Sequence, residues 1–104
     1  MTRIVITGAC GKMGRVINDI VNTRDDCEIT AGIDIAGEQY AGFPVYKKLF
    51  DLPEKPDVII DFSHPSLLDE LLDYCKINNV PVVIATTGYT DEQIKQIKTA
   101  AGQI

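Results

Sequence analysis

The 104-residue sequence has no tryptophan, one histidine, and no run of basic residues longer than the pair Lys47-Lys48. Acidic residues outnumber basic ones by 15 to 10, and the resulting net charge of −5 argues against a surface that binds nucleic acid or anionic lipid. No apolar stretch approaches the roughly 18 residues that a membrane-spanning helix needs, and no apolar signal segment follows Met1. We therefore expect neither nucleic-acid nor membrane partners.

Cysteine is also scarce and unpatterned. The three residues Cys10, Cys27 and Cys75 are an odd number and form no C-x-x-C motif, which predicts reduced thiols and a cytoplasmic location. Hydrophobic residues make up 45% of the chain and charged residues 24%, as in ordinary folded proteins. The length supports one domain.

Apolar runs alternate with segments of helical period along the whole chain. The runs predict strands over 3–7, 28–34, 57–62 and 81–85, with a brief edge strand at Val45-Tyr46. Each pair of strands is separated by enough residues for a helix, and the strands are apolar on both faces. This combination indicates an α/β fold in which helices cover both faces of a parallel sheet.

Three helices are expected between and after these strands. They begin at Lys12, at about Pro65 and at Thr90, where Gln93 completes a capping box, and Asn78-Asn79 ends the second. Their predicted buried stripes are Met13, Val16, Ile17, Ile20 and Val21 in the first, Leu67, Leu68, Leu71, Leu72 and Cys75 in the second, and Ile94, Ile97 and Ala101 in the third. The sequence stops where another strand is due, so we expect truncation before a second domain.

A glycine-rich loop lies between the first strand and the first helix. Gly8, Gly11 and Gly14 are spaced G-x-x-G-x-x-G, a variant of the dinucleotide-binding pattern, and Asp34 follows 20 residues later at the end of the second strand. Such glycines let a pyrophosphate approach the backbone at a helix N-terminus, and such an acid accepts the hydroxyls of the adenosine ribose. A purely structural turn is the alternative, but this context favours dinucleotide binding.

Two other loops follow strands at the same edge of the predicted sheet. They are the segments 62–65, Phe-Ser-His-Pro, and 85–89, Ala-Thr-Thr-Gly-Tyr. They could be a helix cap and a turn. Because ligands of open α/β sheets bind beyond the carboxyl ends of the strands, we instead expect both loops to flank the nicotinamide end of a cofactor.

These three segments together resemble the amino-terminal domain of the 4-hydroxy-tetrahydrodipicolinate reductase family, also called dihydrodipicolinate reductases. The resemblance covers essentially the whole chain and implies a Rossmann-type domain, residues 1–104, that binds NADH or NADPH. It implies an oxidoreductase of lysine and diaminopimelate biosynthesis, which reduces a dihydrodipicolinate-type intermediate to tetrahydrodipicolinate. The resemblance further implies that the full-length protein is a homotetramer and takes a dicarboxylate substrate.

The resemblance also assigns residues. It places Gly11, Lys12 and Met13 along the pyrophosphate with Gly8 and Gly14, and Asp34 at the ribose; Phe62, Ser63, Ala85, Thr86 and Gly88 lie around the nicotinamide, and Thr87 reaches the substrate carboxylate. Ala85 stands where many members have glycine, which puts backbone contacts there in doubt.

The family's paired-histidine and lysine motif is absent from these residues. His64 is the only histidine and occupies a variable position, so we expect it to begin a helix rather than act as a general acid. We expect this chain alone to bind cofactor without turnover. We expect Cys10 to fill a loop position rather than to serve as an activated thiolate, and Asp61 to accept backbone N–H groups rather than a phosphoryl group as in a receiver domain.

Two questions stay open at this point. A stand-alone nucleotide-sensing or CoA-binding module has the same architecture and is the alternative function. Cofactor choice is expected to favour NADH, because Asp34 would repel a 2′-phosphate and the next residues supply no cation, although Lys12 could permit NADPH. The pair Lys47-Lys48 is interpreted as solvated surface.

Overall fold

The computed structural model describes residues 1–35, 39–85 and 88–101. Five parallel strands form one sheet in the order β3-β2-β1-β4-β5. The strands are β1 (Thr2–Thr7), β2 (Cys27–Ile33), β3 (Val45–Tyr46), β4 (Val58–Asp61) and β5 (Val82–Ile84). This confirms the predicted α/β fold, with strand boundaries within about two residues of those expected.

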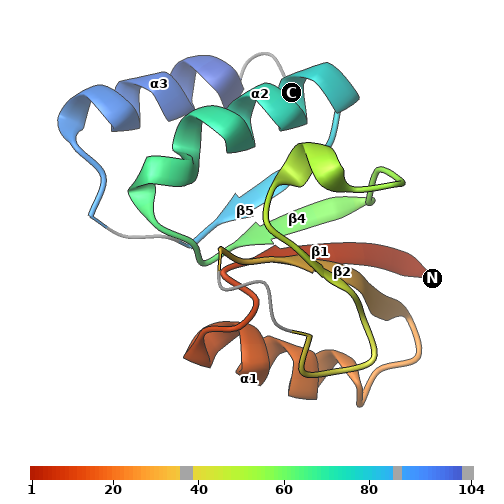
Figure 1. Ribbon diagram of the computed structural model, residues 1–104. Helices are drawn as coiled ribbons and strands as arrows, with labels where there is room; N and C mark the ends of the chain where they lie inside the picture. The colour runs from red at the N-terminus through yellow and green to blue at the C-terminus, as the bar shows by residue number, and fades with distance from the viewer. Residues whose placement is uncertain (36–38, 86–87, 102–104) are drawn as a thin grey trace.

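Helices cover both faces of the sheet (Figure 1). Helix α1 lies on one face, and α2 and α3 lie side by side on the other. The helices are α1 (Lys12–Val21), α2 (Leu68–Asn78) and α3 (Asp91–Ala101), with short 3-10 helices η1 (Leu49–Asp51) and η2 (Pro65–Leu67). None of the helices in the described parts of the chain combines the length and apolar character needed to cross a lipid bilayer.

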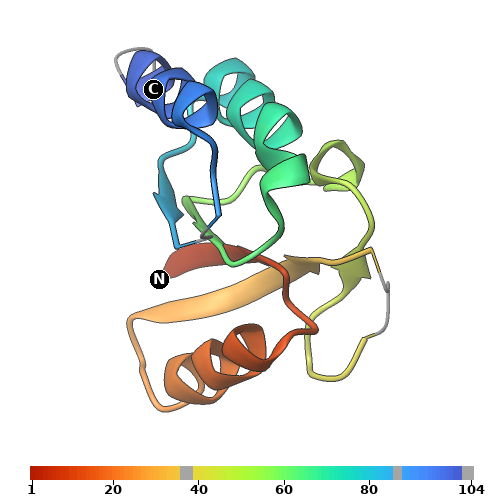
Figure 2. The ribbon, with the colours of Figure 1, turned by 90° about the vertical axis from the view of Figure 1, so that its left-hand side faces the viewer.

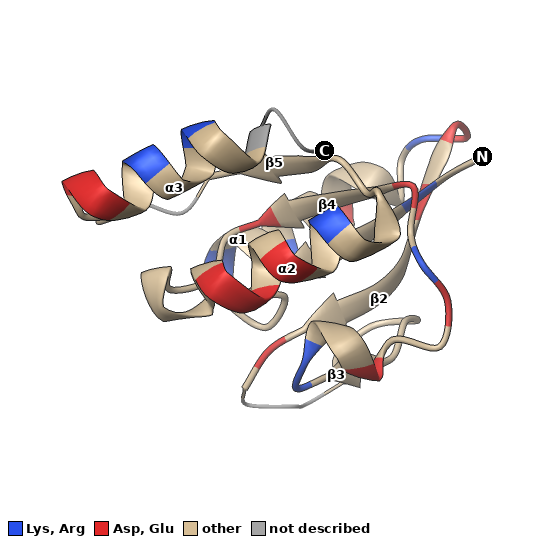
Figure 3. Cartoon of the chain, turned by 90° about the horizontal axis from the view of Figure 1, so that it is seen from above, with Lys and Arg blue, Asp and Glu red and all other residues tan. Residues whose placement is uncertain are grey.

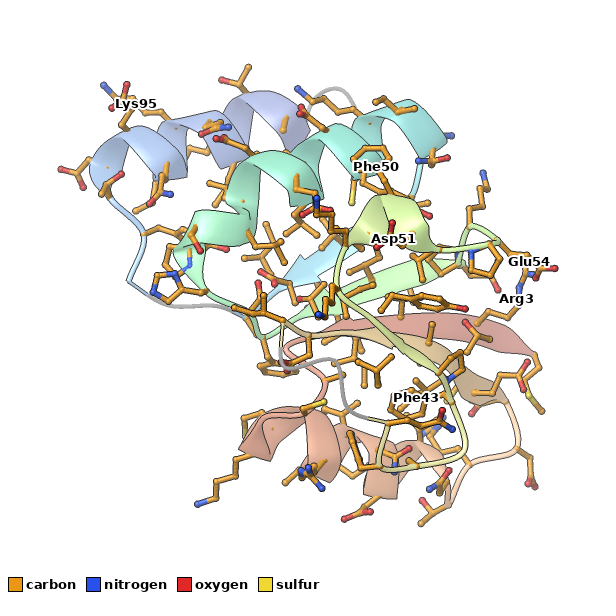
Figure 4. The ribbon with its side chains drawn as sticks, viewed as in Figure 1. Arg3, Phe43, Phe50, Asp51, Glu54 and Lys95 are labelled. Atoms are coloured by element: carbon orange, nitrogen blue, oxygen red, sulfur yellow. The ribbon has the colours of Figure 1, made fainter. Side chains whose placement is uncertain are left out.

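The central strand β1 is buried on both faces, as its continuous apolar sequence predicts. Ile4 and Ile6 join the core under α1, which Phe43 also enters (Figure 4), whereas Val5 joins the core under α2. The β1–β2 register shifts after Ile4, so that Thr30 is an extra residue in β2. This irregularity was not expected from the sequence.

Helix α1 forms where expected and buries part of the predicted stripe. Val21 is buried and Ile17 packs against the same core cluster, as predicted, and Gly14 and Asn18 are buried as well. Three residues of the predicted stripe are instead exposed, namely Met13 (47%), Val16 (41%) and Ile20 (52%). The prediction was wrong for these three, because at its start α1 packs through the small Gly14 against the backbone of Ala9 rather than through a large side chain.

The other two helices follow their predicted stripes more closely. In α2, Leu68, Leu71, Leu72 and Cys75 are buried, and Asn79 ends the helix with φ of +55°. In α3, Ala100 is buried and Ile97 packs on the same cluster, but Ile94 is 41% exposed, which corrects the prediction for that residue. The side chain of Ala101 lies outside the described residues.

All three cysteines are thiols, as predicted. Cys75 is fully buried, and burial raises the pKa of its thiol to about 11, with the carboxylate of Asp61 adding to the shift. At pH 8 such a thiol is ionised to about one part in a thousand.

We expect iodoacetamide to alkylate the half-buried Cys27 in the native protein and to alkylate Cys75 only after denaturation, as read by peptide mass spectrometry. Equal labelling of both in the native state would contradict this burial.

Candidate functional site

The candidate site lies at the edge of the sheet where the strands end. Figure 2 looks onto that edge, with α1 below the sheet and α2 and α3 above it. The chain leaves β1 toward β2 on one side, and β4 pairs with β1 on the other. The strand order therefore reverses between β1 and β4, which is where ligands of open α/β sheets bind.

The glycine-rich loop joins β1 to α1 across this point. The backbone N–H of Gly8 donates to Ile33 O at 2.7 Å, and that of Gly11 donates to Gly8 O at 3.0 Å. Gly11 is the N-cap of α1 but offers no side chain to cap it, and the first turn holds no acidic residue. The N–H groups and the positive dipole end of α1 are therefore left for an anion.

Two glycines of this loop make close contacts that no side chain would permit. Gly8 has φ of +69°, and a Cβ there would lie 2.5 Å from Phe62 O. A Cβ at Gly14 would lie 2.4 Å from Ala9 O. Gly8 therefore brings the β1 loop against the β4 loop, and Gly14 lets α1 pack on its own entry loop.

Asp34 lies beside the same loop. Its Oδ2 accepts a hydrogen bond from the backbone N–H of Cys10 at 3.0 Å, and its own N–H donates to Tyr46 O at 2.9 Å. The carboxylate is thus tied to the glycine-rich loop, and the backbone is tied to the end of β3. This fixes a negative charge at the far end of the loop from β4.

Two cavities adjoin at the glycine-rich loop, and together they are called the groove below. One, of about 670 Å³, lies toward β5 and α3; the other, of about 450 Å³, lies toward Asp34. Each is within the size range of small-molecule sites. Five residues line both cavities: Gly8, Gly11, Phe62, Ser63 and His64. The two cavities could hold the two halves of one ligand, with an anionic group between them at the uncapped start of α1.

Most of the sequence-predicted site residues lie around this groove. The larger cavity is lined by Lys12, Met13, Ala85 and Gly88, and the smaller by Asp34, in addition to the shared residues. Gly14 lines neither cavity, because it is buried within α1 against the backbone of Ala9. Thr86 and Thr87 lie outside the described residues.

A buried carboxylate holds the β4 side of the groove together. Asp61 is fully buried and accepts hydrogen bonds from the Thr7 hydroxyl, from the Ser63 N–H (3.1 Å) and hydroxyl, and from the Tyr89 hydroxyl (3.2 Å). The predicted role of Asp61 as an acceptor of backbone N–H is confirmed. Through these bonds it joins β1, the loop after β4 and the loop before α3.

The segment before α3 is fixed to the β4 loop as well. The predicted capping box is present, since Gln93 N–H donates to Thr90 Oγ1 at 3.2 Å and Thr90 N–H donates to Gln93 Oε1 at 3.0 Å. The Gln93 amide Nε2 also donates to Pro65 O at 3.2 Å. Pro65, Thr90 and Gln93 all line the larger cavity.

His64 begins η2, as predicted. Its Nδ1 accepts from the Ser66 N–H at 3.2 Å and lies 3.0 Å from Ser66 Oγ. The ring therefore caps the helical turn while lining the groove. Cys10 is likewise a loop residue, whose N–H is used to hold Asp34.

The interpretation of Lys47-Lys48 as solvated surface was incomplete. Both residues, together with Glu70, line the cavity that contains Asp34. The sequence separates them from Asp34 by more than ten residues, but β3 pairs in parallel with β2, so the residues that follow these strands become neighbours. The prediction of a short strand at Val45-Tyr46 was the signal that could have revealed this.

Comparisons with known proteins agree with this geometry. Residues 2–104 match the family model described as dihydrodipicolinate reductase, N-terminus. A 4-hydroxy-tetrahydrodipicolinate reductase from Clostridium novyi (strain NT) is 41% identical over 97 residues, which are 93% of this chain and 38% of the relative. One from Clostridium tetani (strain Massachusetts / E88) is 38% identical over 104 residues, all of this chain and 41% of the relative.

A solved structure is also similar. Dipicolinate-bound dihydrodipicolinate reductase from Paenisporosarcina sp. TG-14 superposes with a TM-score of 0.80 and 34% identity over 97% of this chain and 43% of that one. The chain thus spans about two fifths of the length of the curated relatives it matches. With a family match that runs from residue 2 to residue 104, the chain belongs to the dihydrodipicolinate reductase family and corresponds to its N-terminal part.

Proposed function

We propose that this chain binds NADH or NADPH and forms the cofactor-binding part of a 4-hydroxy-tetrahydrodipicolinate reductase. The observation that carries the proposal is the pair of cavities that share Gly8 and Gly11 as lining residues at the start of α1. Membership of the family supports the same assignment. The reduction of a dihydrodipicolinate-type dicarboxylate to tetrahydrodipicolinate is proposed for the whole protein.

The residues present fit such a dinucleotide. The side-chain-free loop and the uncapped start of α1 suit the pyrophosphate, and Asp34 suits the ribose hydroxyls of the adenosine half. The nicotinamide half would lie in the larger cavity, between Phe62 and Ser63 on one side and Ala85 and Gly88 on the other. When bound, the cofactor supplies the hydride; the chain's own groups hold it and orient its ring.

Asp34 bears on the choice between the two cofactors. Its carboxylate is held in place by the Cys10 N–H and can accept ribose hydroxyls, whereas a 2′-phosphate would be repelled by it. We propose that Asp34 favours NADH. Lys12 lines the other cavity, on the far side of the glycine-rich loop.

The remaining proposals concern the whole protein and are supported by membership of the family. A dicarboxylate substrate, a role for Thr87 at its carboxylate, a homotetramer and a cytoplasmic setting are proposed for the whole protein. The 104 residues include one histidine, and its ring caps η2, so we propose cofactor binding without turnover for this chain by itself.

The test uses a variant designed to keep the fold and lose the ligand. At Gly11, φ is −75°, which any residue adopts, and aspartate is a good N-cap. In Gly11→Asp the new carboxylate would occupy the anion position itself. A Cβ at Gly11 would lie 3.2 Å from Gly8 O, and this close contact offsets the gain from the cap, so we expect the stability to stay within about 1 kcal/mol of the unmodified chain. NADH affinity should fall at least about tenfold (~1.4 kcal/mol).

Binding is measured by calorimetry and by NADH fluorescence, with CoA titrated in parallel. Gly42→Asp carries the same charge change at an exposed glycine outside the groove and should bind like the unmodified chain. Binding of CoA without NADH or NADPH would favour the alternative module. Binding of none of the three would refute the proposed function.

A further inference from the structure

The adenosine end of the groove contains two lysines that the cofactor-binding pattern in the sequence does not include. Lys47 and Lys48 follow β3, and both line the cavity that holds Asp34. Figure 3 shows this basic segment beside the acidic end of β2. Cationic and anionic side chains therefore share one wall of the smaller cavity.

The backbone that carries the lysines is fixed at both ends. Before them, Tyr46 pairs with Ile33, and Tyr46 O accepts from the Asp34 N–H at 2.9 Å. After them, Leu49 is fully buried, and its N–H donates to Glu70 Oε1 at 2.9 Å. The two lysines thus lie on a short segment whose two ends are held by hydrogen bonds, one of them to Asp34.

The charges of the two lysines are not neutralised by ion pairs within the described parts of the chain. Neither lysine ammonium has a hydrogen-bond or ion-pair partner within the parts of the chain that the structure describes. Glu70, the other acid of this wall, accepts the Leu49 N–H. The two exposed ammonium groups are therefore available for an anionic group of a ligand, in a cavity lined also by the carboxylates of Asp34 and Glu70.

We propose that Lys47 and Lys48 accept the 2′-phosphate of NADPH and thereby limit the preference for NADH that Asp34 imposes. The inference rests on the proposed function. A 2′-phosphate adds about 1.5 to 2 negative charges at pH 7, next to the ribose hydroxyl that Asp34 would accept. The two lysines balance the two carboxylates of this wall, Asp34 and Glu70, and Glu70 is already bonded to the Leu49 N–H, so the wall tolerates the phosphate that Asp34 alone would repel.

The experiment compares NADH and NADPH dissociation constants for the unmodified chain, for Lys47→Ala/Lys48→Ala and for Asp34→Ala. In the lysine variant we expect the NADPH constant to rise about tenfold and the NADH constant to change less than about twofold. Its NADPH binding should also lose much of its dependence on salt. In Asp34→Ala, NADPH should bind more tightly relative to NADH.

The matched control is Lys95→Ala/Lys98→Ala, which removes the same charge from α3, outside the groove, and should leave the ratio of the two constants unchanged. Equal weakening of both cofactors by the groove variant, or no change in either, overturns the assignment of the lysines. A chain that binds NADH but not NADPH also overturns it while leaving the proposed function intact. A chain that binds neither NADH nor NADPH overturns both the assignment of the lysines and the proposed function.

Discussion

Alanine at Gly8 is expected to lower the free energy of unfolding by about 2–4 kcal/mol and to abolish measurable NADH binding. The residue has φ of +69°, which an L side chain adopts only with strain. The new Cβ would also lie 2.5 Å from the backbone oxygen of Phe62, which is held in the β4 loop and cannot simply rotate away. Relief would require separation of the β1 and β4 loops, and these loops form the middle of the groove.

The measurement is denaturation by urea followed by circular dichroism, since the chain has no tryptophan, together with NADH titration. Gly42→Ala is the matched control, because no atom lies within 4 Å of a Cβ there and its φ is not in the left-handed region. Its stability should stay within about 0.5 kcal/mol of the unmodified chain. If Gly8→Ala behaves like this control, the described loop contact is wrong.

Removal of the Asp61 carboxylate should destabilise the chain by about 3–5 kcal/mol. In Asp61→Ala, at least four donors from Thr7, Ser63 and Tyr89 lose their acceptor in a fully buried position. Hydroxyls can rotate toward other acceptors, but the backbone N–H of Ser63 cannot. The loops on the two sides of the larger cavity would also lose their common anchor.

The variant Asp61→Asn removes the negative charge of the side chain but keeps its shape, so it separates the contributions of the two to stability. The amide keeps one acceptor oxygen and nearly the same volume, so we expect it to recover at least half of the lost stability in the same denaturation measurement. Because Asp61 acts through Ser63 and Tyr89 rather than by contact with a ligand, NADH affinity should fall with Asp61→Ala and recover partly with Asp61→Asn. A stability of Asp61→Ala close to that of the unmodified chain would count against the network.

The fold could be predicted from the sequence because its signals are local. The apolar runs, Pro65, the Thr90–Gln93 capping box and Asn79 each act within a few residues, and the structure places each of them where expected. Period alone could not decide which face of α1 is buried. That face depends on the close approach of Gly14 to Ala9, a contact between backbones that hydrophobicity does not encode.

The parts of the candidate site that form a local sequence pattern could be predicted. The parts that come together only through the pairing of strands far apart in the sequence could not. The glycine-rich loop and Asp34 form a known sequence pattern, and both lie at the groove. The sequence alone predicts solvated surface at Lys47 and Lys48, because their place beside Asp34 depends on the pairing of β2 with β3. Likewise, the hydroxyls that Asp61 accepts come from residues up to 54 positions away.

The reversal of strand order between β1 and β4 makes ligand binding a reporter of global folding. The groove is lined by residues between 8 and 48 from the first part of the chain and by residues between 62 and 93 from the second, so neither part can form the site alone. The groove exists only when the long-range β1–β4 pairing is complete. A ligand held at one hundred times its dissociation constant should therefore protect the entire chain against unfolding and proteolysis by about 2.7 kcal/mol, rather than rigidify one loop.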